Sequence, residues 1–106
     1  MVQVSKLQSN IAVVKPQTQR LDAAMADSFK SDIKSIVDGG ARHIVIDFSG
    51  VQFMDSSGLG ALVGSLKYIG AGGVIEIAMP CDAVQKVLKL TRMNKVFPMR
   101  DSLPTD

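Results

Sequence analysis

The stretch HIVIDFSGVQFMDSSGLGALVG, residues 43–64, places a strand pattern, a polar turn and a helix pattern in succession. Residues 43–48 form a compact run rich in β-branched side chains, with Ile44, Ile46 and Phe48 on one face. After a connecting loop over 49–55, apolar residues recur at the spacing of a helix with one buried stripe: Leu59, Leu62, Val63, Leu66 and Ile69. The stretch therefore predicts a strand that leads through a polar loop into a helix.

The rest of the chain extends this alternation. Residues 2–7 and 11–15 predict two short strands joined by a turn at Ser9 and Asn10. A strand is predicted over 74–79 and an edge strand over 95–99, while residues 98–106 are expected to be a solvated tail. The first helix is predicted from Leu21 to a stop at Gly39 and Gly40, and the third over 82–93. The expected buried residues of these two helices are Leu21, Met25, Phe29, Ile33, Ile36, Val37, Val84, Val87, Leu88 and Thr91.

This order of elements determines the expected fold class. Strands that alternate with helices pair in parallel through right-handed crossovers. We expect residues 1–106 to form one α/β domain, with a small mixed β-sheet of four to five strands and helices packed mainly on one face.

Composition excludes several classes of function. The net charge is only +2, from 12 basic and 10 acidic residues that are scattered along the sequence, and aromatic residues make up 5%. This pattern does not favour nucleic-acid binding. The single cysteine, Cys81, allows no internal disulfide, and no apolar run approaches the roughly 20 residues of a membrane span. We expect a cytoplasmic protein that contacts neither nucleic acid nor membrane.

Asp55, Ser56 and Ser57 stand together where the second helix is expected to begin. In open α/β sheets, binding sites tend to lie where the strands end and helices start. Helix capping is the simpler interpretation, since an Asp or Ser at a helix start stabilises it by about 1 kcal/mol. Capping explains one such residue better than three, and both interpretations stay open.

The second helix also has an unusual face opposite its apolar stripe, on which Lys67 is the only charge between Asp55 and Glu76. Glycine in a helix interior costs about 0.8–1 kcal/mol relative to alanine, and exposed helix faces normally carry charged residues. We therefore expect a partner to pack on this face. The alternative is that its glycines allow close approach to the protein's own sheet. The residues concerned are Ser57, Gly60, Ala61, Gly64, Ser65 and Tyr68.

A phosphate on a hydroxyl of this turn would act as a switch. It adds about −1.5 to −2 charges at pH 7, which the positive end of a helix dipole tolerates. A partner packed on the turn would instead have to desolvate that charge. We expect the fold to survive such a modification while the partner is released.

The segments HIVIDFSGVQFMDSSGLGALVG and GGVIEIA, and more weakly RLDAAMADSFKSDI, resemble the STAS domain in the form found in bacterial anti-sigma factor antagonists. The resemblance runs from the first strand to about residue 97. It implies a non-enzymatic partner-switching protein that binds a GHKL-type serine kinase, which is also the anti-sigma factor. That kinase phosphorylates the antagonist and ends the interaction, and a PP2C-type phosphatase restores it.

Carried over by position, the resemblance implies that Ser56 is the phosphorylated residue, with Ser57 as second choice. The residues implied or expected around the phosphorylated side chain are Asp22, Asp47, Asp55 and Gly58, where Asp47 would orient the loop. Two departures from the family stand out. The approach to Asp22 reads PQTQR where the family often has glycine, and RDSLPTD stands where many members have a final helix. Some STAS domains are never phosphorylated and serve as accessory subunits of ABC transporter ATPases, which is the alternative function.

Enzymatic alternatives find little support in the residues. A hydrolase nucleophile would need Gly-x-Ser-x-Gly, but Met54 stands two before Ser56. The only histidine, His43, begins a strand and is expected about 20 Å from the serines. Gly58, Gly60 and Gly64 miss the spacing of a dinucleotide-binding loop, and one His with one Cys gives no metal-ligand pattern. We expect no catalytic residues, no cofactor and no metal.

Overall fold

A computed structural model describes residues 1–105 of the chain. Five strands form one mixed sheet in the order β1-β2-β4-β6-β7, in which β1 is antiparallel to β2 and the other pairs are parallel. Two further strands, β3 and β5, form a separate parallel pair. The bounds are Val2–Lys6 (β1), Ile11–Pro16 (β2), Arg20–Leu21 (β3), His43–Asp47 (β4), Phe53–Met54 (β5), Val74–Ala78 (β6) and Met99–Arg100 (β7).

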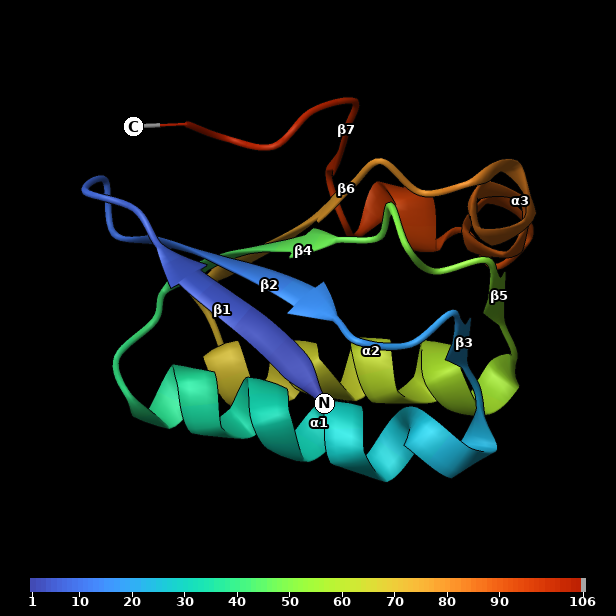
Figure 1. Cartoon of the computed structure of the whole chain (residues 1–106), viewed down its shortest axis with the longest axis horizontal. Coiled ribbons are helices and arrows are strands. Elements are labelled where there is room, and N and C mark those ends of the chain that lie inside the picture. The colour runs from blue at the N-terminus through green and yellow to red at the C-terminus, as the bar shows by residue number, and fades with distance from the viewer. Residues whose placement is uncertain (106) are drawn as a thin grey trace.

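Three α-helices accompany the sheet: α1 (Ala23–Asp38), α2 (Ser56–Ile69) and α3 (Asp82–Leu90). A short 3-10 helix, η1 (Met93–Lys95), follows α3. Figure 1 shows α1 and α2 side by side beneath one face of the sheet, while α3 lies beyond the end of the strands near β5. The predicted α/β fold, with a mixed sheet and helices mainly on one face, is confirmed.

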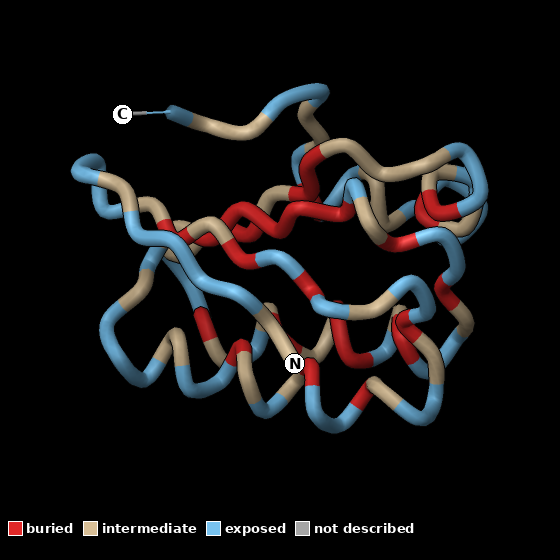
Figure 2. Tube along the Cα trace, viewed as in Figure 1, coloured by how far each residue is buried: buried red, intermediate tan, exposed pale blue. Residues whose placement is uncertain are grey.

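The core lies between the sheet and the α1–α2 layer (Figure 2). Alternate strand residues point toward the helices, because successive side chains of a strand face opposite sides. In β4 these are Ile44 and Ile46, which are fully buried together with Phe29 and Ile33 of α1. The α2 stripe divides into two groups: Leu62 and Ile69 are buried, whereas Leu59, Val63 and Leu66 pack against the core while partly exposed.

The C-terminal region differs from the prediction in three respects. The third helix ends at Leu90 and not at 93, which leaves Thr91 exposed, and the segment predicted as a strand over 95–99 begins as η1. The last strand is Met99–Arg100, which pairs with β6 at the edge of the sheet; the predicted edge strand is confirmed only at Met99, and Arg100 lies in the predicted solvated tail. Residues 101–105 then run along the side of the sheet opposite α1 and α2 (Figure 1), with Leu103 and Pro104 half-buried. Asp106, the end of the predicted tail, lies outside the described residues.

The short pair β3–β5 was absent from the prediction, which treated 49–55 as loop and began the first helix at Leu21. Two-residue strands carry no detectable alternation, so only the tertiary pairing reveals them. Leu21 is indeed buried, but it belongs to β3, and α1 begins two residues later at Ala23. No helix among residues 1–105 is long and apolar enough to cross a bilayer.

Candidate functional site

The β3–β5 pair brings the starts of α1 and α2 together. Arg20 pairs with Phe53 and Leu21 with Met54, in parallel register. Each strand is followed directly by an aspartate and a helix, so Asp22 and Asp55 leave the pair at the same end. The Asp55 amide donates to the Leu21 carbonyl at 3.4 Å, which ties the two junctions to each other. The sequence places these aspartates far apart, and the fold makes them neighbouring residues of one site.

Both aspartates are N-caps. One carboxylate oxygen of Asp22 accepts from the Ala24 amide at 3.1 Å, and one of Asp55 accepts from the Gly58 amide at 2.9 Å. The second oxygen of Asp22 accepts from Nε of Arg20 at 3.4 Å. The capping interpretation is therefore confirmed for Asp55, and it leaves the two serines without a part in the cap.

Ser56 and Ser57 are the first two residues of α2, and both are exposed. Neither hydroxyl forms a hydrogen bond with any side chain or backbone group of residues 1–105. They stand at the positive end of the helix dipole, where backbone N–H groups favour a nearby anion. A second molecule can reach these hydroxyls, and a phosphate attached to either would point into solvent.

Gly58 has a structural role that follows from the close approach of α2 to β3. A Cβ atom at this position would lie 1.9 Å from the Leu21 carbonyl oxygen and 2.8 Å from its carbon. No real side chain can occupy that space unless the backbone of β3 moves. Gly58 therefore fixes the distance between the serine turn and the Asp22 junction, and its predicted place around the turn has a steric reason.

The uncharged face of α2 packs mainly on α1. Ala61 is only 5% exposed, and a Cβ atom on Gly64 would lie 3.1 Å from Cε of Lys30. The Tyr68 ring is half-buried beneath two lysines of α1, with Nζ of Lys30 and of Lys34 at 5.9 and 6.0 Å from its centroid. Ala61 is thus largely covered by the fold, and its predicted contact with a partner stays a prediction. The close approach that the alternative placed at the sheet is made to α1.

Charge at the far end of this face comes from α1. Nζ of Lys34 donates a hydrogen bond to the Asp38 carboxylate at 2.8 Å. This bond holds the pKa of Lys34 above its ordinary value of 10.5. Lys34 therefore remains a cation beside Tyr68 at neutral pH. With Lys30 it supplies the charge that α2 itself lacks along this face.

A groove between α1 and α2 runs directly from the serine turn. Ser57 and Gly60 form its α2 side and are exposed, and Ala61 forms its floor. The α1 side is polar, with Asp27 and Lys30 as its charged groups. The remaining lining residues are Ala23 and Ala26. Of the five residues expected to bind a partner, Ser57 and Gly60 are the ones that α1 leaves uncovered at this groove.

Asp47 has no hydrogen bond with the serine turn among residues 1–105. It is the last residue of β4, is 6% exposed, and accepts a hydrogen bond from the Ser49 amide at 2.9 Å. Farther along the same loop, the amides of Gln52 and Phe53 donate to the Gln19 carbonyl at 2.8 and 3.2 Å. Asp47 therefore holds the first residues of the loop that carries β5, and that it orients the serine turn stays a prediction.

One contact beside this site, between a cation and an aromatic ring, could not be recognised from the sequence pattern. The Arg20 guanidinium lies over the Phe53 ring at 4.1 Å from the centroid, and both side chains are exposed. Phe53, the first residue of β5, is 38% exposed although its side chain is large and apolar. The pair forms the outer surface of β3–β5 next to the helix starts. Among residues 1–105, no group of three or more His, Cys, Asp and Glu side chains is placed to hold a metal ion.

Comparison with known proteins identifies the family. A family model described as the STAS domain matches residues 4–105. An anti-sigma F factor antagonist of Paenibacillus polymyxa is 36% identical over 62 residues, which is 58% of this chain and 53% of that protein. The chain thus spans about half the length of this relative. A Thermotoga maritima protein with the provisional name of anti-sigma factor antagonist is 27% identical and covers more, namely 92% of this chain and 88% of its own length.

Solved structures agree on the fold. The crystal structure of the Thermotoga maritima protein tm1081 superposes with a TM-score of 0.87 at 25% identity, over 97% of this chain and 88% of that one. An anti-sigma factor antagonist from Mycobacterium paratuberculosis gives 0.86 at 24% identity, over 97% and 86% of the two chains. The Bacillus protein SpoIIAA, solved in a phosphorylated form, gives 0.72 at 22% identity, over 96% and 92%.

Proposed function

The chain belongs to the STAS domain family, and on that premise we propose that it is an anti-sigma factor antagonist switched by phosphorylation of Ser56. In this proposal the unmodified protein binds a GHKL-type serine kinase, which is also the anti-sigma factor, and thereby releases the kinase's client. Phosphorylation of Ser56 ends the complex, and a PP2C-type phosphatase restores the binding form. The exchange takes place in the cytoplasm, and the chain itself catalyses no reaction.

The exposed, unbonded Ser56 hydroxyl at the start of α2 is the observation that carries this proposal. Phosphoryl transfer requires an in-line approach of the acceptor oxygen to the γ-phosphorus of ATP. The Ser56 oxygen forms the new P–O bond, ADP leaves with the electrons of the broken one, and the hydroxyl proton passes to a base. Asp22 and Asp55 already cap helices, so the proposal assigns that base to the kinase.

The energetics favour release of the partner over unfolding of the chain. The dianion sits at a helix N-terminus, where it gains about 0.3–1 kcal/mol at an exposed site, while Asp55 repels it at short range. These two effects act in opposite directions within the free protein. In the complex, the partner removes water from the phosphate, and an unpaired buried charge costs several kcal/mol. The modification therefore weakens the interface and leaves the fold intact.

Site mapping tests the modification directly. The purified protein, incubated with its kinase and ATP, is expected to gain one phosphate on Ser56, found by tandem mass spectrometry. Ser56→Ala should abolish incorporation, whereas Ser57→Ala should retain it. Modification only at residues outside the turn would contradict the proposal. If the folded protein incorporates no phosphate but binds the ATPase subunit of an ABC transporter, the alternative function as an accessory subunit would be favoured.

Gly60 provides a test of the groove, because the fold does not need a glycine there. A Cβ atom at this position meets nothing within 4 Å. Gly60→Ala is expected to raise the free energy of unfolding by about 0.5–1 kcal/mol through helix propensity, and to weaken kinase binding, because the new methyl group fills the groove. Urea denaturation and isothermal titration calorimetry measure the two effects. Lys67→Ala, on an exposed position of α2 outside the groove, is the control; unchanged kinase affinity in Gly60→Ala would remove the groove from the interface.

A further inference from the structure

Four basic residues, expected to be scattered, stand close together in the sequence on α3, on η1 and between them. Residues 83–99 hold four of the 12 basic residues and none of the 10 acids. The rest of the chain therefore has more acidic than basic residues. We call these four residues the α3 basic surface: Lys86 and Lys89 of α3, Arg92 after it, and Lys95 of η1.

All four of these side chains are exposed, and none forms an ion pair within residues 1–105. Of the eight other basic residues, three form ion pairs within residues 1–105. Arg20 pairs with Asp22, Lys34 with Asp38, and Arg100 with Glu76 at 3.7 Å. Four uncompensated cations within residues 86–95 repel one another, so this region gains free energy from an acidic group that covers it.

Arg92 adds an independent observation, because its backbone is left-handed. Its φ is +61° and ψ is +17°, directly after the end of α3. This helix-end position favours glycine or asparagine, since a Cβ atom there strains the backbone. An arginine at this point costs stability, and its exposed guanidinium contacts no acidic side chain within residues 1–105 that would offset the cost. The exposed cation at this position is therefore held at a cost in backbone energy.

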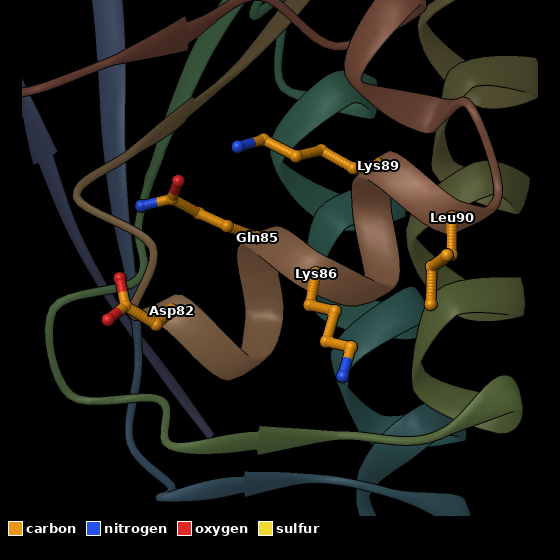
Figure 3. Close-up of a pocket in the computed structure, with 5 residues that line it drawn as sticks. All are labelled: Asp82, Gln85, Lys86, Lys89 and Leu90. Carbon is orange, nitrogen blue, oxygen red and sulfur yellow. The ribbon is translucent and has the colours of Figure 1, made fainter.

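Apolar side chains stand among these cations. Leu90 is 75% exposed, the highest exposure of any large hydrophobic residue in the described chain, and Val96 is 46% exposed. The buried stripe of α3 is separate from them, since Val84 and Leu88 face the core. Figure 3 shows Lys86 and Leu90 projecting to one side of α3, with Gln85 and Lys89 on the other. Together with Asp82 at the helix start, these side chains line a shallow hollow.

We propose that the α3 basic surface is a second docking surface, for an acidic segment of a protein partner that contributes both carboxylates and apolar side chains. Carboxylates pair with the four cations, and an aliphatic side chain packs against Leu90 or Val96. The surface lies on α3 and η1, which are separate from the α1–α2 groove beside Ser56 (Figure 1). We expect binding here not to depend on the phosphorylation proposed above.

A protein segment fits this surface better than other polyanions do. Phosphate backbones are usually bound by a longer row of cations with interleaved aromatic rings, and this surface has four cations and no aromatic ring. A bilayer would require a broad apolar face, but the apolar stripe of α3 is already buried in the core. Isolated apolar anchors ringed by charges match the composition of protein interfaces.

The test uses a fluorescein-labelled amphipathic peptide rich in Glu and Leu, with fluorescence anisotropy as the readout. The same peptide with Gln in place of Glu is the neutral probe, and duplex DNA and vesicles of anionic lipid are the other probes. The acidic peptide is expected to bind the unmodified protein, and Lys86→Glu combined with Lys89→Glu should reduce its affinity about tenfold or more. Lys6→Glu combined with Lys15→Glu, which changes the net charge equally on β1 and β2, should leave it within about twofold.

Equal loss in both double variants, or equal affinity for the neutral peptide, would overturn the proposal. Tighter binding of DNA or of vesicles than of the peptide, lost in the α3 variant, would assign the surface to those partners and overturn the protein assignment. Ser56→Asp should bind the peptide as the unmodified protein does. Arg92→Gly should raise Tm by about 4 °C, because the backbone strain is relieved, and should lower peptide affinity severalfold. A lower Tm in Arg92→Gly would contradict the argument from strain.

Discussion

Gly58→Ala is expected to destabilise the protein more than any other single methyl group added to α2. The added carbon would lie 1.9 Å from a backbone oxygen of Leu21, and neither a helix backbone nor a paired strand yields as a flexible side chain does. We expect a loss of about 3 kcal/mol or more in the free energy of unfolding, a large part of the 5–15 kcal/mol typical of a domain. Urea denaturation followed by circular dichroism measures it.

Gly60→Ala is the matched control, since it makes the same substitution two residues further along the same helix. Its added carbon meets no atom within 4 Å, so its effect should have the opposite sign. Similar stability changes in the two variants would show that helix propensity alone governs both positions. The steric explanation of Gly58 would then be wrong.

Ser56→Asp is expected to reduce affinity for the kinase about 100-fold, while Ser56→Ala binds as tightly as the unmodified protein. The physical reason is desolvation: the aspartate is exposed in the free protein and must lose its water in the complex without gaining a cation. Isothermal titration calorimetry with the kinase measures both affinities. Melting curves of the two variants should agree within a few degrees, because the side chain points into solvent.

Ser5→Asp controls for net charge, since Ser5 is an exposed serine on the edge strand β1. It should leave kinase affinity unchanged within about twofold. Equal affinities of Ser56→Asp and Ser56→Ala would remove the electrostatic basis of the switch. That result would not decide which residue is phosphorylated, which the mass-spectrometric experiment tests separately.

The main elements could be predicted because each carries its own periodicity. Ile44 and Ile46 alternate along β4, and Phe29 and Ile33 recur at helical spacing along α1; all four are fully buried as expected. Asp55 was recognisable as a helix-start residue, since capping is a local interaction over three residues. Local patterns suffice wherever one face of an element meets the core.

The α2 face shows where a local pattern is ambiguous. Gly60 and Gly64 look equivalent in the sequence, four residues apart on an uncharged face. In the structure, Gly64 lies against the Lys30 side chain, whereas Gly60 borders open space at the groove. The absence of charged side chains on a helix face indicates only that another surface covers that face. Whether the covering surface is α1 or a second molecule depends on how the helices pack.

The sequence by itself determined the fold class, the helix start at Asp55 and the family, because these follow from periodicity, capping chemistry and a specific motif near residues 53–64. The tertiary structure alone decided that the β3–β5 pair joins the Asp22 junction to the Asp55 junction, and that Gly58 must be glycine because it lies against Leu21. Each of these depends on pairing between segments distant in the chain. Such pairing leaves no periodic mark on two-residue strands or on exposed side chains, so no local pattern could have shown it.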